Sequence, residues 1–165
     1  MTGIINRLIM FVILLLVQVL ILNHVWLFNV ATPLLYVYFV ITFPRNSAKG
    51  EVLVWSFCLG LLVDLFSNTP GMASATMTLL ALLQPYLLEL FVPRDSAENM
   101  EVTSATLGWT KFLTFCLILT FLYCLVFFAI EAFNFFDWQI WLLHMVGSTV
   151  LTMILMIAID SVRSK

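Results

Sequence analysis

The chain alternates long apolar stretches with short polar ones. The first stretch, Leu8 to Phe43, contains no Asp, Glu, Lys or Arg. At a rise of 1.5 Å per residue it is too long for one helix across a hydrocarbon core of about 30 Å. Polar residues between Asn23 and Asn29 are expected to turn the chain back, and Thr32 and Pro33 suit the N-cap and first position of a returning helix.

Four more apolar stretches follow in the remaining sequence. The turn Ser67 to Gly71 joins two of them into a hairpin, and the most polar segment, Pro93 to Thr106, precedes the next. We therefore predict an all-α integral membrane protein, a bundle of six transmembrane helices that forms a single domain over residues 1–165. The predicted spans are residues 8–22, 27–43, 52–66, 72–92, 112–130 and 138–159.

The composition favours a membrane protein as well. Apolar residues make up 63% of the chain and charged residues only 10%, a balance that would leave a water-soluble domain with an aggregating surface. The formal net charge of −2 gives no basic field for a nucleic acid. We expect the lipid bilayer, and no nucleic acid, as the surroundings.

The positions of the cations predict the orientation of the spans. Short cytoplasmic loops are enriched in Lys and Arg, and the opposite loops are depleted of them. With six spans and a cytoplasmic N-terminus, the three outer loops contain no cation. Both termini are therefore expected on the cytoplasmic side of the membrane, with all seven cations: Arg7, Arg45, Lys49, Arg94, Lys111, Arg163 and Lys165.

One ionisable residue lies inside the third predicted span. Asp64 follows Gly60 by four residues, and Gly60 follows Ser56 by four, so the three share one helical face. A charged group at the centre of a membrane helix costs about 2.5–3.5 kcal/mol on insertion scales, so it needs a protein partner.

The fourth predicted span carries a matching face of small and polar residues, which includes Gly71, Ser74 and Thr78. Membrane helices approach closely where small residues face each other and hydrogen bonds join them. We therefore expect these two helices to pack together, with Asp64 facing protein. Asp64 then either caps the turn, through backbone N–H groups of residues 67–69 and 71, or has a binding or coupling role.

Other polar residues in the spans allow two interpretations each. Glu89 either reaches the membrane interface or pairs with Arg94. His144 either packs between helices or pairs with Asp64, and Gln18 is expected to bond a neighbouring helix or a ligand.

The sequence contains no recognisable catalytic or cofactor motif. Two His and no clustered Cys make a zinc site improbable, and neither a phosphate-binding loop nor a nucleophile elbow occurs. We expect a protein that is not an enzyme and has no cofactor or metal.

The second hairpin resembles a known family. The segment Gly60-Leu61-Leu62-Val63-Asp64-Leu65, followed by Asn68-Thr69-Pro70-Gly71, is similar to the Gly-Leu-x-x-Asp-Leu segment and Pro-Gly turn of the rod shape-determining protein MreD family. The size, the early Pro33 and the basic turn at Arg45 extend the likeness over nearly the whole chain.

The resemblance implies a non-enzymatic subunit of the cell-elongation machinery in the bacterial inner membrane. Such a subunit would bind MreC and help to link MreB filaments to the peptidoglycan synthases, RodA and its penicillin-binding partner. In this view Ser56, Gly60, Asp64, Gly71, Ser74, Thr78, Glu89 and His144 are candidates for helix packing or partner coupling.

An alternative is the substrate-binding component of an energy-coupling vitamin transporter, a family that MreD proteins resemble in fold. It would hold a small molecule in an outward cavity near Asp64, His144 and Trp141. Many such components dock through an Ala-x-x-x-Ala pattern in the first span, but residues 4–22 contain no Ala. An intramembrane enzyme, the third possibility, has no motif in its favour.

Overall fold

The computed structural model describes residues 2–24, 31–93, 95–96, 100–132 and 137–163. Among these residues all regular secondary structure is helical, and five helices are long and apolar enough to cross a membrane, namely α1, α3, α4, α6 and α7. The chain is therefore a multi-pass membrane protein. The elements are α1 (Thr2–Leu20), the 3-10 helix η1 (Leu22–His24), α2 (Val37–Ile41), α3 (Lys49–Ser67), α4 (Met72–Phe91), α5 (Ser104–Leu107), α6 (Trp109–Glu131) and α7 (Trp138–Arg163).

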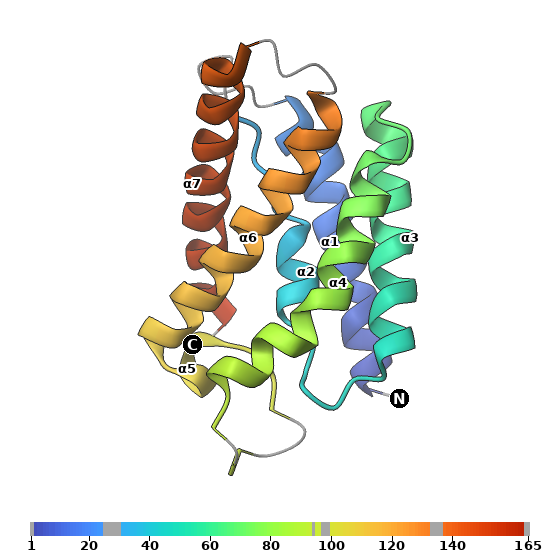
Figure 1. Cartoon of the computed structure of the whole chain (residues 1–165). Helices are drawn as coiled ribbons and strands as arrows, with labels where there is room; N and C mark the ends of the chain where they lie inside the picture. The colour runs from blue at the N-terminus through green and yellow to red at the C-terminus, as the bar shows by residue number, and fades with distance from the viewer. Residues whose placement is uncertain (1, 25–30, 94, 97–99, 133–136, 164–165) are drawn as a thin grey trace.

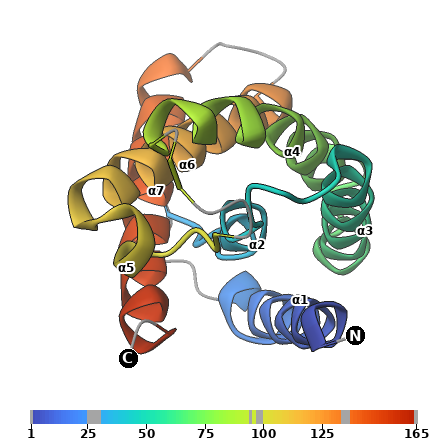
Figure 2. The same ribbon diagram turned by 90° about the horizontal axis from the view of Figure 1, so that it is seen from below.

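The five long helices surround the short helix α2. Seen along the bundle, α1, α3, α4, α6 and α7 form an open ring with α2 inside it (Figure 2). Both termini lie at one end of the bundle (Figure 1), which we call the basal end. The other end, where η1, the α3–α4 turn and the end of α6 lie, is the distal end.

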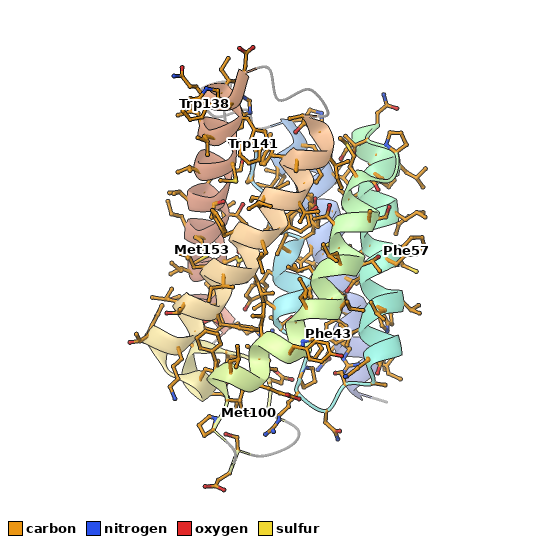
Figure 3. The ribbon with its side chains drawn as sticks, viewed as in Figure 1. Phe43, Phe57, Met100, Trp138, Trp141 and Met153 are labelled. Atoms are coloured by element: carbon orange, nitrogen blue, oxygen red, sulfur yellow. The ribbon has the colours of Figure 1, made fainter. Side chains whose placement is uncertain are left out.

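The described cationic side chains lie at one end of the bundle. Each of them belongs to an element or loop at the basal end: Arg7, Arg45, Lys49, Lys111 and Arg163. At the distal end Trp138 and Trp141 follow one another along the first turn of α7, while Phe57 points outward from the middle of α3 (Figure 3).

The predicted second span, residues 27–43, is wrong as a helix. Residues 25–30 lie outside the described part of the chain, residues 31–36 are not helical, and only Val37–Ile41 form a helix. Neither Thr32 nor Pro33 begins it. Every residue from Leu34 to Ile41 is buried, and we call residues 31–41 the buried segment. Since residues 34–41 have no face toward lipid, their sequence needs no apolar stripe at helical spacing.

Side chains replace the hydrogen bonds that a helix would have supplied. Gln18 Oε1 accepts a bond from the N–H of Leu35 at 3.0 Å, and Gln18 Nε2 donates to the carbonyl of Pro33 at 2.9 Å. The N–H of Leu34 donates to Thr152 Oγ1 at 3.1 Å. Non-helical backbone is tolerated at membrane depth only where protein satisfies it, and here α1 and α7 do so.

The remaining predicted spans coincide with helices of the structure, although their ends differ by a few residues. Spans 52–66 and 72–92 match α3 and α4, and spans 8–22, 112–130 and 138–159 match α1, α6 and α7. α7 continues to Arg163, which brings Asp160 into the helix.

The α3–α4 hairpin is the most extensive helix pair of the bundle. Asn68 ends α3 in the left-handed region, with a φ of 56°, and Gly71 precedes α4 with a φ of 85°; both residue types tolerate that backbone. Gly60 lies farther from the turn, toward the basal end of α3, and its backbone contacts α4 directly. A Cβ at Gly60 would lie 2.6 Å from Ser74 Cα and 2.8 Å from Ala73 O, so only glycine allows the two backbones to come this close.

We predict that Gly60→Ala destabilises the protein by about 1–3 kcal/mol, because the backbones must separate to admit the methyl group. The measurement is unfolding of the detergent-solubilised protein by heat or denaturant. Gly50→Ala, in the same helix, is the matched control, since no atom lies within 4 Å of its added Cβ. It should be neutral or gain up to about 1 kcal/mol in helix propensity. Equal stability of both variants would show that the close approach is dispensable.

Candidate functional site

Asp64 is buried in the α3–α4 hairpin and is fully engaged there. Its Oδ1 accepts hydrogen bonds from the N–H of Ala73 at 2.8 Å and from Thr69 Oγ1 at 3.0 Å, and its Oδ2 accepts one from the N–H of Ser74 at 2.9 Å. Ala73 and Ser74 belong to the first turn of α4. The carboxylate of one helix therefore caps the start of the next.

The Asp64 carboxylate supplies hydrogen-bond acceptors that the start of α4 lacks. The first N–H groups of α4 have no partner within the helix, and an anion there also interacts favourably with the helix dipole. The capping interpretation placed the donors at residues 67–69 and 71, whereas the backbone donors are Ala73 and Ser74. The difference arises because Gly60 brings α4 so close that Asp64 reaches past the turn.

The predicted faces of small and polar residues on α3 and α4 pack against each other along this interface, although not at every residue. Ser56, Gly60, Asp64 and Ser74 are buried. Thr78 is half-buried and donates to the carbonyl of Ser74 at 2.7 Å. In contrast, Gly71 is exposed, and nothing lies within 4 Å of its missing Cβ, so its role is confined to the turn.

Two further candidates lie away from the hairpin interface. Glu89 is exposed near the basal end of α4, and its expected partner Arg94 lies outside the described residues. His144 is half-buried on α7, where its ring stands edge-on to Phe128 with centroids 6.3 Å apart. No hydrogen bond to Asp64 is found for His144 within the described chain, and Asp64 is already bound to its own three donors.

The sequence analysis missed a second buried carboxylate. Asp160 has no exposed surface; its Oδ1 accepts from Tyr38 Oη and its Oδ2 from the N–H of Ser104, both at 3.3 Å. It therefore joins α7 to α2 and to the first turn of α5. The signal was present, since any ionisable residue within an apolar stretch needs a partner, but ending the last span at residue 159 left Asp160 outside it.

Two tyrosines form a polar contact in the centre of the bundle. Tyr36, in the buried segment, and Tyr123, on α6, are almost wholly buried. Their hydroxyl groups are hydrogen-bonded, and their rings meet edge to face with centroids 5.6 Å apart. Like Gln18 and Thr152, this pair attaches the buried segment to the surrounding ring.

A cavity of about 370 Å³ opens at the distal end. Its described lining comes from α1, η1, the buried segment, α3, α4, α6 and α7. Apolar and aromatic side chains alternate with polar ones, and the lining includes His144 but neither Asp64 nor Trp141. Mostly apolar walls with a few polar groups are typical of small-molecule sites.

The described residues contain no cluster of three or more His, Cys, Asp or Glu side chains that could hold a metal ion. Cys58, Cys116 and Cys124 are free thiols. The arrangement described above can hold helices together and can accommodate a ligand.

We predict that Asp64→Asn destabilises the protein by about 1–3 kcal/mol, because the amide turns a donor toward one of the α4 N–H groups. Hydrogen exchange should accelerate at the amides of Ala73 and Ser74. Asp95→Asn, an exposed change in the basal loop, serves as the control and should alter neither. Unchanged exchange in Asp64→Asn would contradict the capping role.

We also predict that Asp160→Asn loosens the basal loop, because the amide replaces one of the two accepting oxygens by an NH₂ group and its remaining oxygen, now uncharged, is a weaker acceptor. Hydrogen-exchange mass spectrometry should show faster exchange in α5. Tyr38→Phe removes one donor and leaves the Ser104 bond, so α5 should stay protected in that variant. Equal exchange in Asp160→Asn and the unaltered protein would refute the link between α7 and α5.

Comparison of the chain with protein-family models, with curated proteins and with solved structures found no match in any of the three.

Proposed function

We propose that the chain is a non-enzymatic subunit of the bacterial cell-elongation complex, of the MreD type, in the inner membrane. In this role it binds MreC and helps to link MreB filaments on the cytoplasmic side to the peptidoglycan synthases, RodA and its penicillin-binding partner, on the other.

The α3–α4 hairpin is the observation that carries the proposal. Three residues of the MreD-like segment carry most of the resemblance. Gly60 and Asp64 form the close approach and the helix cap described above, and Gly71 belongs to the turn before α4. Gly60 and Asp64 both act on backbone groups of α4. A segment that fixes how two membrane helices pack suits a structural subunit.

The distribution of charge supports the orientation that this role needs. The described cations lie at the basal end, and positive residues in short loops remain in the cytoplasm. The proposal therefore places the basal end toward MreB and the distal end toward the peptidoglycan synthases.

The shape of the protein restricts where partners can bind. Loops between the helices are short, and α1 is the least buried of the spanning helices. Its large apolar side chains include Leu8, Val12 and Leu16, all at least 42% exposed. Lipid and partner helices must therefore meet helix faces, as expected for a subunit that binds the single-span MreC.

The test combines isolation and depletion in the native host. A tagged copy should co-isolate with MreC from solubilised membranes, and depletion should make a rod-shaped cell round. Gly50→Ala should restore shape, whereas Asp64→Asn should restore it poorly, in proportion to the lower amount of folded protein. Normal shape after depletion, together with no MreC in the isolate, would defeat the proposal.

The distal cavity favours a second candidate, the substrate-binding component of a vitamin transporter. That function needs an outward pocket for a small molecule, and the cavity has a suitable size. Co-isolation with a transporter's coupling and ATPase subunits, and saturable binding of a vitamin, would favour it over the elongation subunit.

A further inference from the structure

The distal cavity has a consistent electrostatic character. Among the described residues that line it, the exposed Glu131 is the only one with a formal charge at neutral pH when the histidines are neutral; Tyr36, His24 and His144 complete the titratable groups of the lining. Asp64 lies behind Thr69 and Ala73, two residues of the wall. No Lys or Arg lines the cavity within the described chain, so formal charge near it is negative.

Helix ends add to this negative potential. The last residues of α3 and α6 border the cavity through Ser67 and Glu131, and the chain following α1 borders it through Leu22. The carbonyl end of a helix carries a partial negative charge, equivalent to roughly half an elementary charge. The starts of α4 and α7 have the opposite sign. Two of the N–H groups of α4 are already bound to the Asp64 carboxylate, and α7 borders the cavity through His144, which lies beyond its first turn.

The walls of the cavity suit a cation with an apolar body. Phe66, Phe127 and Phe128 present aromatic rings, and Leu34 and Val63 add aliphatic surface. The faces of aromatic rings attract ammonium groups, most strongly where water is excluded. The volume, about 370 Å³, lies near the lower limit of small-molecule pockets, which is about 300 Å³.

We propose that the distal cavity binds a small organic cation, with its ammonium group between Glu131 and the phenylalanine rings and its apolar part directed toward Leu34. The site disfavours anions, because they would meet the Glu131 carboxylate and the carbonyl ends of α3 and α6. This inference goes beyond both candidate functions, neither of which specifies the charge of a ligand.

The experiment is isothermal titration of the whole protein in dodecyl maltoside micelles, a detergent with neither charge nor amine, with empty micelles as the blank. The probes are choline, its uncharged isostere dimethylbutanol, benzyltrimethylammonium and phenylacetate. Both cations should bind saturably, benzyltrimethylammonium more tightly because its ring adds apolar contact. Saturable binding of phenylacetate, or equal binding of choline and dimethylbutanol, would overturn the proposal.

Variants assign the binding to the cavity. Glu131→Gln should weaken cation binding about two- to fivefold, the range expected for one solvent-exposed charge pair. Glu89→Gln removes an exposed carboxylate at the other end of the bundle and should change nothing. Leu22→Trp, which fills the cavity, should abolish binding. Equal effects of Glu131→Gln and Glu89→Gln, or full binding by a folded Leu22→Trp protein, would place the cation elsewhere and refute the site.

A final arm separates two sources of the cation. Phosphatidylethanolamine added to the micelles should compete with benzyltrimethylammonium if the natural ligand is the amine of a lipid headgroup, and phosphatidylglycerol serves as the lipid control. Binding unaffected by both lipids identifies a free organic cation as the ligand class. Competition by phosphatidylglycerol alone would overturn the proposal, because that lipid carries no cation.

Discussion

The backbone of residues 31–36 must be hydrogen-bonded without being helical, and the bundle is arranged around this need. Water is absent from the hydrocarbon core, so each unpaired N–H or C=O there costs several kcal/mol. Gln18 on α1, together with Ser148 and Thr152 on α7, supplies the missing partners. The segment can therefore exist only inside the ring, and α1 and α7 must flank it although they have few contacts with each other.

Two aspartates meet a related need at opposite ends of the bundle. Asp64 binds the first N–H groups of α4 at the distal end, and Asp160 binds the N–H of Ser104 at the start of α5 at the basal end. Each carboxylate is buried, and hydrogen-bond donors offset the free-energy cost of removing it from water. Asp64 thus fixes the start of α4, and Asp160 helps to fix the start of α5, where Arg163 also pairs with Glu101 of the preceding loop. This explains how a protein with such short loops keeps a defined shape at both membrane surfaces.

Hydropathy and turn residues predicted the five spanning helices, since each is a long apolar run bounded by polar residues. The same signal could not distinguish a membrane-spanning helix from a buried segment that is helical only in part, because Leu34 to Ile41 is apolar in either case and periodicity is lost when all sides are covered. The hydrogen bonds of Gln18 to the buried segment depend on a contact between distant parts of the chain, which no local pattern encodes. At the hairpin, by contrast, Gly60 and Asp64 were identifiable from spacing alone, because both act on the neighbouring helix in sequence. Asp160 was missed for a simpler reason: the predicted last span ended one residue before it.

The position of the distal cavity follows from the same buried segment. Around α2 the segment is helical and fills the ring toward the basal end, where the neighbouring cavity between α1 and α7 measures about 120 Å³. Around Thr32 and Leu34 it is not helical, and there the larger space of about 370 Å³ opens. Interrupted membrane helices often mark binding sites because they leave room and polar groups together. If residues 31–36 were helical, their N–H groups would bond within the helix, and Ser148 and Thr152 would lose these backbone partners. The non-helical backbone thus lies where the space for a ligand opens.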